Sequence, residues 1–233
     1  MLLDCHLHTR NYSSCSMLDP SQACTLAAKR GLHALVFTEH HRLWDVDDLT
    51  IIQRKHPEIV LHRGMEISLA EGYDLVVVSA RVTKEFDPGT PFSKLEKALD
   101  RVRQESFVFL AHAFRYTARA DAAMETILDY VDAVEQSSIN ILGLGCAREG
   151  GRFRSLRAPL YEDASRRHGR PGIYNSDGHH PRAVGAVASA TDDAVLSADP
   201  EEFVAQLRRA VFREYQNTAL LDALFGKKKE DGV

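Results

Sequence analysis

Two histidines, His6 and His8, end a short apolar run close to the start of the chain. Residues i and i+2 of a β-strand point to the same face, so the two imidazoles are expected side by side. Imidazole nitrogens are good ligands for zinc, manganese and iron. The spacing predicts half of a divalent-metal site, although the pair alone would be weak support for one.

Most of the later apolar runs also end in histidine or carboxylate residues. These ends carry His40 and His41, Glu66, His112 with Arg115, Glu135, and Asp177 with His179 and His180. The active site of a parallel β/α barrel lies at the carboxyl ends of its strands. A carboxylate can bridge two metal ions, and such a pair can polarise a phosphoryl oxygen and activate water. The pattern therefore predicts a multinuclear metal site suited to hydrolysis.

The elements that must position these residues alternate along the chain. Strand-like apolar runs cover residues 2–8, 34–38, 60–67, 75–80, 107–112, 133–136 and 172–175. Helix starts are indicated by Asp-Pro at 19–20 and 199–200 and more weakly by Thr-Pro at 90–91, and Gly31 is a helix stop. Further helices are expected over 121–130 and 160–168, and 143–151 is read as a long loop.

This alternation predicts an α/β fold, a distorted (β/α)7 TIM-like barrel in a single domain. A doubly wound open sheet is the alternative. The barrel domain is expected over residues 1–215, and residues 216–233 are expected to form a helical or disordered C-terminal tail. The run Lys227-Lys228-Lys229 in that tail is interpreted as solvated.

The composition argues against nucleic acid as a partner and favours a reducing compartment. The chain has 233 residues and a net charge of −4, which gives no basic field to recruit nucleic acid. It shows neither a signal peptide nor a transmembrane run. The four cysteines form no CxxC pair, which fits a reducing cytoplasm. Four histidines are interpreted as surface residues: His33, His56, His62 and His168.

Together these motifs resemble the polymerase and histidinol phosphatase (PHP) family of metal-dependent phosphoesterases. The matching pieces appear in family order and span residues 4–185. They are Asp4-x-His6-x-His8-Thr9, Thr38-Glu39-His40, Gly64-x-Glu66-Ile67, Ala111-His112, Val134-Glu135, Ser176-Asp177-x-His179 and Val184-Gly185. The resemblance implies a distorted barrel of seven β/α units that holds two or three divalent ions, manganese, zinc or iron, with magnesium as a further possibility.

When the family's ligands are transferred to the matching positions of this chain, the resemblance implies a set of ligands for each ion. The first ion would be held by His6, His8, Glu66 and Asp177. Glu66 would bridge to a second ion that also takes His112, and a third would take His40 and His179.

The chain departs from the family pattern in several places. Residues 13–16 contain no acid or histidine to complete the third site. Asp74 stands where a further histidine is usual and is a possible oxygen ligand. Glu39 replaces the usual aspartate and is another possible ligand. Glu135 is expected to orient a ligand histidine.

Residues near the predicted site could bind the substrate or move protons. Arg115 and Arg148 are candidates to grip a phosphate, and His41 is a candidate to face the substrate. His179 or His180 could protonate the leaving group. A surface or structural role remains open for each of these residues.

The leading hypothesis is a cytoplasmic metal-dependent phosphoesterase. It would hydrolyse a small phosphate monoester, such as histidinol phosphate or a nucleoside mono- or bisphosphate. One alternative is a nuclease or proofreading-type phosphodiesterase acting on nucleic acid. Another is a non-catalytic relative that binds a metal or a partner protein. The sequence leaves the substrate, the metal, the identity of the general acid and the oligomeric state open.

Overall fold

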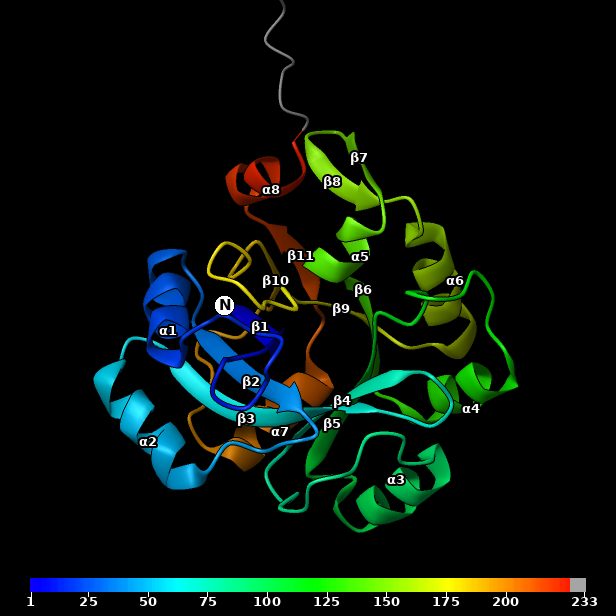
Figure 1. Ribbon diagram of the computed structural model, residues 1–233, viewed down its shortest axis with the longest axis horizontal. Coiled ribbons are helices and arrows are strands. Elements are labelled where there is room, and N and C mark those ends of the chain that lie inside the picture. The colour runs from blue at the N-terminus through cyan, green and yellow to red at the C-terminus, as the bar shows by residue number, and fades with distance from the viewer. Residues whose placement is uncertain (227–233) are drawn as a thin grey trace, which may run out of the picture.

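A single nine-stranded sheet bends into a nearly closed barrel (Figure 1). The computed structural model describes residues 1–226. In spatial order the strands are β11 (Arg213–Gln216), β10 (Val187–Ala190), β1 (Leu2–Leu7), β2 (Ala34–His40), β3 (Val60–Ser68), β4 (Asp74–Ser79), β5 (Ser106–Ala111), β6 (Ala133–Ser137) and β9 (Gly172–Tyr174). The predicted barrel class is confirmed, and all seven predicted strands are present within one or two residues.

Strand β4 runs against both of its neighbours, unlike a strand of a regular parallel barrel. The connection from β3 to β4 covers only residues 69–73, which is too short for a parallel crossover. The reversal brings the start of β4 to the edge where β3 and β5 end. Asp74 accordingly pairs in register with Ser68 and Ala111.

Two short antiparallel strands, β10 and β11, were not predicted and extend the sheet beyond β1. The gap between β10 and β9 is bridged by a side chain. The buried hydroxyl of Ser189 accepts a hydrogen bond from the Tyr174 amide at 2.9 Å and donates one to the Tyr174 carbonyl at 2.8 Å. Ser189 therefore takes the place of a main-chain ladder where the barrel would close.

Helices surround the barrel in Figure 1. Their bounds are α1 (Pro20–Lys29), α2 (Val46–Lys55), α3 (Phe92–Leu99), α4 (Ala122–Tyr130), α5 (Ile139–Gly143), α6 (Ala158–His168), α7 (Pro200–Arg209) and α8 (Thr218–Phe225), with a 3-10 turn, η1 (Asp100–Val102), after α3. Asp19 and Asp199 cap α1 and α7 through their carboxylates, as predicted. Thr90 does not cap α3, whose N-cap is Pro91.

Helix α7 covers the end of the barrel opposite the predicted site. Its buried Phe203, Val204 and Leu207 join the apolar cluster formed by β1, β2, β4, β5, β6 and β9. The ring of His62, near the start of β3, stacks on Phe203 with centroids 3.8 Å apart. His62 is 4% exposed, so its assignment to the surface is wrong. Phe203 of α7 covers its ring.

The region after β6 is more ordered than its sequence indicated. Residues predicted as a loop form part of a hairpin, β7 (Cys146–Glu149) and β8 (Arg152–Ser155). Helix α8 packs on this hairpin through the fully buried Leu221. The expected tail therefore begins in β11 and continues as a packed helix. The run Lys227-Lys228-Lys229 lies outside the described residues.

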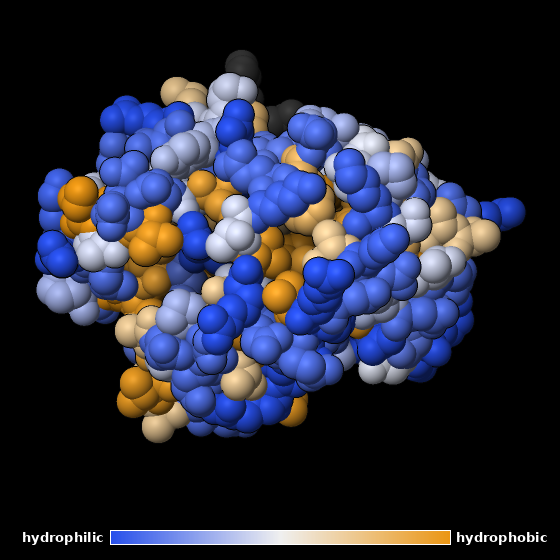
Figure 2. Space-filling model, turned by 90° about the horizontal axis from the view of Figure 1, so that it is seen from below, coloured by the Kyte–Doolittle hydropathy of each residue, from blue (hydrophilic) through white to orange (hydrophobic). Residues whose placement is uncertain are grey.

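The face shown in Figure 2 is mostly hydrophilic, with separate hydrophobic patches between the polar side chains. Within residues 1–226, none of the helices is long and apolar enough to cross a membrane.

Candidate metal centre

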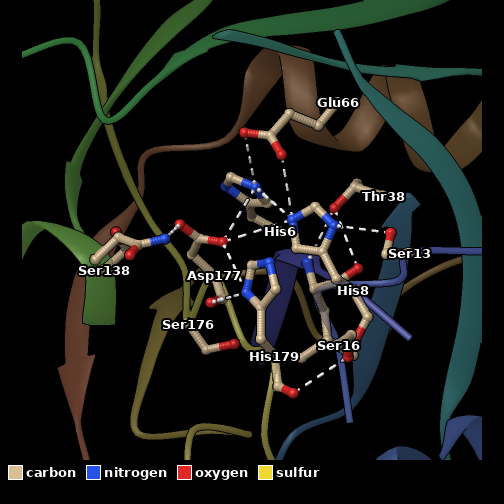
Figure 3. Close-up of polar contacts among 12 residues, drawn as sticks. His6, His8, Ser13, Ser16, Thr38, Glu66, Ser138, Ser176, Asp177 and His179 are labelled. Carbon is tan, nitrogen blue, oxygen red and sulfur yellow. Dashed lines mark hydrogen bonds and ion pairs between the residues drawn. The ribbon is translucent and has the colours of Figure 1, made fainter. Parts of the chain in front are cut away.

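Seven predicted ligands converge at the carboxyl ends of the strands, and Glu66 lies at the centre of the group. Its Oε1 is 3.0 Å from His112 Nε2 and 3.4 Å from His6 Nε2. Its Oε2 is 2.9 Å from His40 Nδ1 and 3.3 Å from His8 Nε2. Figure 3 shows Glu66 facing the imidazoles of His6 and His8 from β3.

Asp177 supplies a second carboxylate from the loop after β9. Its Oδ1 lies 3.5 Å from His6 Nε2, from His8 Nε2 and from His179 Nδ1. The Nε2 atoms of His6 and His8 are 3.1 Å apart, which confirms that the two imidazoles share a face. In Figure 3, Asp177 and His179 close the cluster on the side away from Glu66.

The donor atoms fall into three groups that could each hold an ion. They are His6, His8 and Asp177; His6, Glu66 and His112; and His8, His40 and His179. Two ligands about 2.1 Å from one tetrahedral zinc ion lie about 3.4 Å apart, close to the spacings here. Imidazole nitrogens and carboxylate oxygens suit zinc, manganese and iron. The residues present therefore fit divalent metal ions.

The electrostatics of the cluster favour cations. Burial lowers the pKa of His6, but the carboxylates of Asp177, Glu66 and Glu135 outweigh it and raise that pKa well above its ordinary value. For His112, the nearby Glu66 outweighs burial and raises the pKa to about 9. Conversely, burial raises the pKa of Glu66, and the histidines, His6 foremost, hold it well below its usual range. The buried acids thus create a negative field that a metal ion would also meet.

The pKa of His179 shifts in the opposite direction from those of His6 and His112. Burial, and then the neighbouring His8, lower its pKa to about 4. Its imidazole is therefore neutral at pH 7, which is the state needed to bind a metal ion.

Buried acids behind the ligands hold them in place. Glu135 accepts hydrogen bonds from His6 Nδ1 at 3.1 Å and from the His112 amide at 3.2 Å. Asp4 Oδ1 accepts from the amides of His6 at 3.2 Å and Ser176 at 3.1 Å, which ties β1 to the loop that carries Asp177. Such supports fix ligand orientation.

Glu39 takes a supporting role of the same kind. Its carboxylate accepts hydrogen bonds from the Thr9 amide and hydroxyl, the Ser13 hydroxyl and Trp44 Nε1. These donors occupy both oxygens, so Glu39 holds the loop after β1 and belongs to none of the three groups. Asp74 likewise stands outside the groups, with Oδ2 3.6 Å from His112 Nδ1.

The backbone is strained next to the ligands. His41, His112 and Asp177 are the non-glycine residues with positive φ among residues 1–226, at 61°, 27° and 49°. Each such residue costs about 1–3 kcal/mol. Hydrogen bonds from the His41 amide to the Glu66 carbonyl and from the Asp177 amide to the His6 carbonyl, at 2.8 and 2.9 Å, hold two of these turns.

A cavity of about 1090 Å³ opens over the cluster and is lined by His40, Glu66, Asp74, His112, Asp177 and His179. Arg115 and His180, two of the candidates to meet a substrate, also line it. Arg148 and His41 do not. Arg148 lies on the β7–β8 hairpin and pairs with Asp222 at 2.6 Å, and the half-buried ring of His41 has an Nδ1 without a hydrogen-bond partner among the described residues.

Sequence reasoning missed several residues of this cavity. Asn140 donates a hydrogen bond from Nδ2 to Asp177 Oδ2 and lines the wall, as do Tyr116, Arg182 and Leu224. Asn140 lies on α5, the helix that begins shortly after β6, so a search that extends a few residues beyond each strand end could have found it too. Leu224 carries no such signal, because it lies on a helix remote in sequence from the strand ends.

A barrel with clustered histidines and buried carboxylates at its strand ends defines a metal-dependent hydrolase. The chain belongs to the PHP family of metal-dependent phosphoesterases: the PHP domain model matches residues 4–144, and a PHP-associated model matches residues 160–212. The resemblance drawn from the sequence is thus confirmed. No curated protein matches the sequence.

Solved structures show the same fold at low sequence identity. PsfC from Pseudomonas syringae is 15% identical with a TM-score of 0.67, and the match covers 97% of each chain. A two-domain protein from Bacteroides vulgatus that contains a predicted PHP-like metal-dependent phosphoesterase is 16% identical with a TM-score of 0.63, covering 93% of this chain and 64% of that one.

A nuclease shares the fold as well. The lesion-specific endonuclease EndoQ from Pyrococcus furiosus is 12% identical with a TM-score of 0.56, covering 91% of this chain and 57% of that one. At this level of identity the likeness shows the fold alone.

Proposed function

We propose that this protein is a phosphatase that hydrolyses a small phosphate monoester in a metal-dependent reaction. One observation carries the proposal: five of the seven ligand side chains line a cavity that is also lined by an arginine without an acidic partner among the described residues. Arg115 forms no ion pair within residues 1–226, and its guanidinium lies 5.2 Å from the centroid of the Tyr116 ring. A free guanidinium beside a cationic centre suits a phosphate.

Two or three ions of manganese, zinc or iron, or else magnesium, would be held by His6, His8, Glu66, Asp177, His112, His40 and His179. When bound, they would supply Lewis acidity at the phosphoryl group and lower the pKa of water toward ~7. Glu66 contacts four of the histidines, so its carboxylate would be available to the ions that those histidines hold.

The chain's own residues orient the substrate and move the proton. The loop that carries Arg115 is anchored by Arg157, whose Nη1 donates to the carbonyls of Arg115 at 3.2 Å and Thr117 at 3.4 Å. Arg115 would bind the phosphoryl oxygens. His180 lines the cavity, and its Nδ1 accepts the Arg182 amide hydrogen at 3.2 Å in the neutral ring. To act as the general acid, His180 would carry a proton on both nitrogens, so this contact would give way before the ring donates its Nε2 proton to the leaving oxygen and returns to the neutral form. His179 is engaged among the ligands.

A phosphate-release screen tests this proposal. The purified protein is incubated with phosphomonoesters, nucleotides, a phosphodiester and single-stranded DNA, each with manganese, zinc, iron or magnesium. We expect release from monoesters that chelation abolishes. Cleavage of DNA or the diester without monoester turnover would instead favour a nuclease, the second candidate, which the fold shared with EndoQ supports.

Arg115→Ala provides the matched test of phosphate binding, with Arg119→Ala as its control. Both arginines lie on the loop after β5, but Arg119 does not line the cavity. We expect the KM for a monoester to rise about tenfold or more in Arg115→Ala and to stay unchanged in Arg119→Ala. Equal effects of the two variants would contradict the assignment of Arg115.

A further inference from the structure

The cavity is much larger than a phosphate group, and part of its lining is apolar. Its volume of about 1090 Å³ is at the upper end for small-molecule sites. The metal ligands and Arg115 account for part of the lining. Leu69, Tyr116, Ile139 and Leu224 also line it. The space between these side chains and the metal ligands is where the alcohol part of a phosphate ester would lie.

Leu224 reaches the cavity from α8, outside both matched regions. The family models cover residues 4–144 and 160–212, whereas α8 spans Thr218–Phe225. This part of the wall is thus contributed by a segment that the family matches do not include. It is a place where this chain can differ from other PHP proteins.

Several contacts fix α8 beside the cavity. Asn217 caps the helix by accepting the Leu220 amide hydrogen, and its own amide donates to the Ala186 carbonyl at 2.9 Å. Leu221 is fully buried against the β7–β8 hairpin. Asp222 pairs with Arg148 at 2.6 Å. Arg148 is therefore connected to the cavity indirectly, because its partner Asp222 lies on the helix that carries Leu224.

The loop after β5 contributes an exposed aromatic ring to the lining of the cavity. Tyr116 is 79% exposed, an unusual position for a large ring, and it lines the same cavity as Leu224. Apolar and aromatic walls reward a flat or apolar ligand and offer few hydrogen bonds to a polyhydroxylated one.

We propose that Leu224, with Leu69, Tyr116 and Ile139, forms a binding site for the leaving group and that the substrate is a phosphate ester of an aromatic or otherwise apolar alcohol. The proposal rests on the phosphatase function proposed above. Leu224 is then a residue that determines specificity rather than a catalytic residue.

The test compares Leu224→Ser with Leu220→Ser. Both leucines lie on α8, are partly buried and pack on the same apolar cluster, but only Leu224 lines the cavity. The probes are 1-naphthyl phosphate and glycerol 2-phosphate. In Leu224→Ser we expect the KM for naphthyl phosphate to rise roughly tenfold with kcat little changed, and the constants for glycerol phosphate to stay the same. Leu220→Ser should leave both substrates unaffected.

Further variants and a binding measurement distinguish failure of the apolar site from misfolding and from failure of the phosphatase function. Leu224→Met should retain the preference for naphthyl phosphate, and Leu224→Ala replaces the serine variant if that one fails to fold. Binding of 1-naphthyl phosphonate, measured calorimetrically on metal-loaded protein, does not require turnover. Binding that depends on Leu224 without hydrolysis of any ester would reject the phosphatase function and keep the apolar site. Equal losses for both probes, or in both leucine variants, would overturn the site.

Discussion

His6 and His62 are both buried on strands of the same sheet, but they lie at opposite ends of the barrel. His6, on β1, faces the carboxylates of Glu66, Glu135 and Asp177, which raise its pKa well above the ordinary value despite burial. His62, on β3, stacks on Phe203 and donates from Nε2 to the Ser197 carbonyl at 2.9 Å. Burial there lowers its pKa to about 4.

The contrast separates two reasons for burying a histidine. At the His6 end, desolvation is compensated by acids that would also attract metal ions. At the His62 end, no carboxylate contacts the ring among the described residues, so the imidazole stays neutral and acts as an aromatic packing residue. The acids around a buried histidine, rather than its burial, mark the candidate ligand.

Replacing each histidine by glutamine tests most directly whether only the His6 end of the barrel binds metal. We expect His6→Gln to lose metal and to reduce phosphate release about 100-fold or more, because a ligand shared by two groups is removed. His62→Gln should keep its full metal content. Metal analysis after loading with manganese or zinc, alongside phosphate release, gives the answer. Equal metal loss in both variants would show that the two ends are not distinct.

The pH dependence of stability isolates the contribution of His62. Its pKa is about 4 in the folded protein and 6.5 in the unfolded chain, so the unfolded chain binds the proton more readily. The stability that the buried, neutral His62 ring contributes is fully present above pH 6.5 and is lost as the pH falls toward 4. The loss amounts to about 3 kcal/mol of the free energy of unfolding.

Urea unfolding of the parent and His62→Gln at pH 7.5, 5.5 and 4.5 measures this contribution. The acid sites elsewhere are common to both proteins, so the difference between the two curves reports on His62. We expect the variant to lose less stability than the parent on acidification. Parallel curves would mean that the His62 ring can be protonated without penalty.

The same two histidines show how far the sequence alone could be interpreted. Strand-end placement brought His6, His8, Glu66, His112 and Asp177 to one site, because the ends of parallel strands meet at one edge of a barrel. His62 was misassigned because a single histidine in an apolar run gives no sign of what packs against it. Phe203, its stacking partner, lies far away in sequence.

The direction of β4 and the ion-pair partner of Arg148 also depend on contacts between residues that the local sequence does not show. The apolar run of β4 does not encode its direction, although the short connection of residues 69–73 already excluded a parallel neighbour. Arg148 was a reasonable phosphate candidate until Asp222, 74 residues away, proved to be its partner. The Asp-Pro helix starts were predicted correctly because capping is local.

Asp4 offers a finer test of what supports the His6 end. Asp4→Ala would leave the buried amides of His6 and Ser176 without an acceptor, at a cost of about 2 kcal/mol of the free energy of unfolding. Asp4→Asn keeps an acceptor oxygen, and its amide can donate to the unpartnered Ser176 hydroxyl. It should therefore be milder. Urea unfolding and metal titration compare the two, and a larger loss in Asp4→Asn would contradict this role.

The ion pair between Arg148 and Asp222 should show the smallest effect, because charges at a surface behave unlike those at the His6 end. The two side chains are 52% and 42% exposed, so water screens their attraction, and exposed pairs contribute about 0.2–1 kcal/mol. A double-mutant cycle of Arg148→Ala and Asp222→Ala measures the coupling energy, which we expect to lie within that range. The KM for naphthyl phosphate should rise less in these variants than in Leu224→Ser. A coupling well above 1 kcal/mol would show that α8 depends on this pair more than on the buried Leu221, and the apolar packing assigned to α8 would need revision.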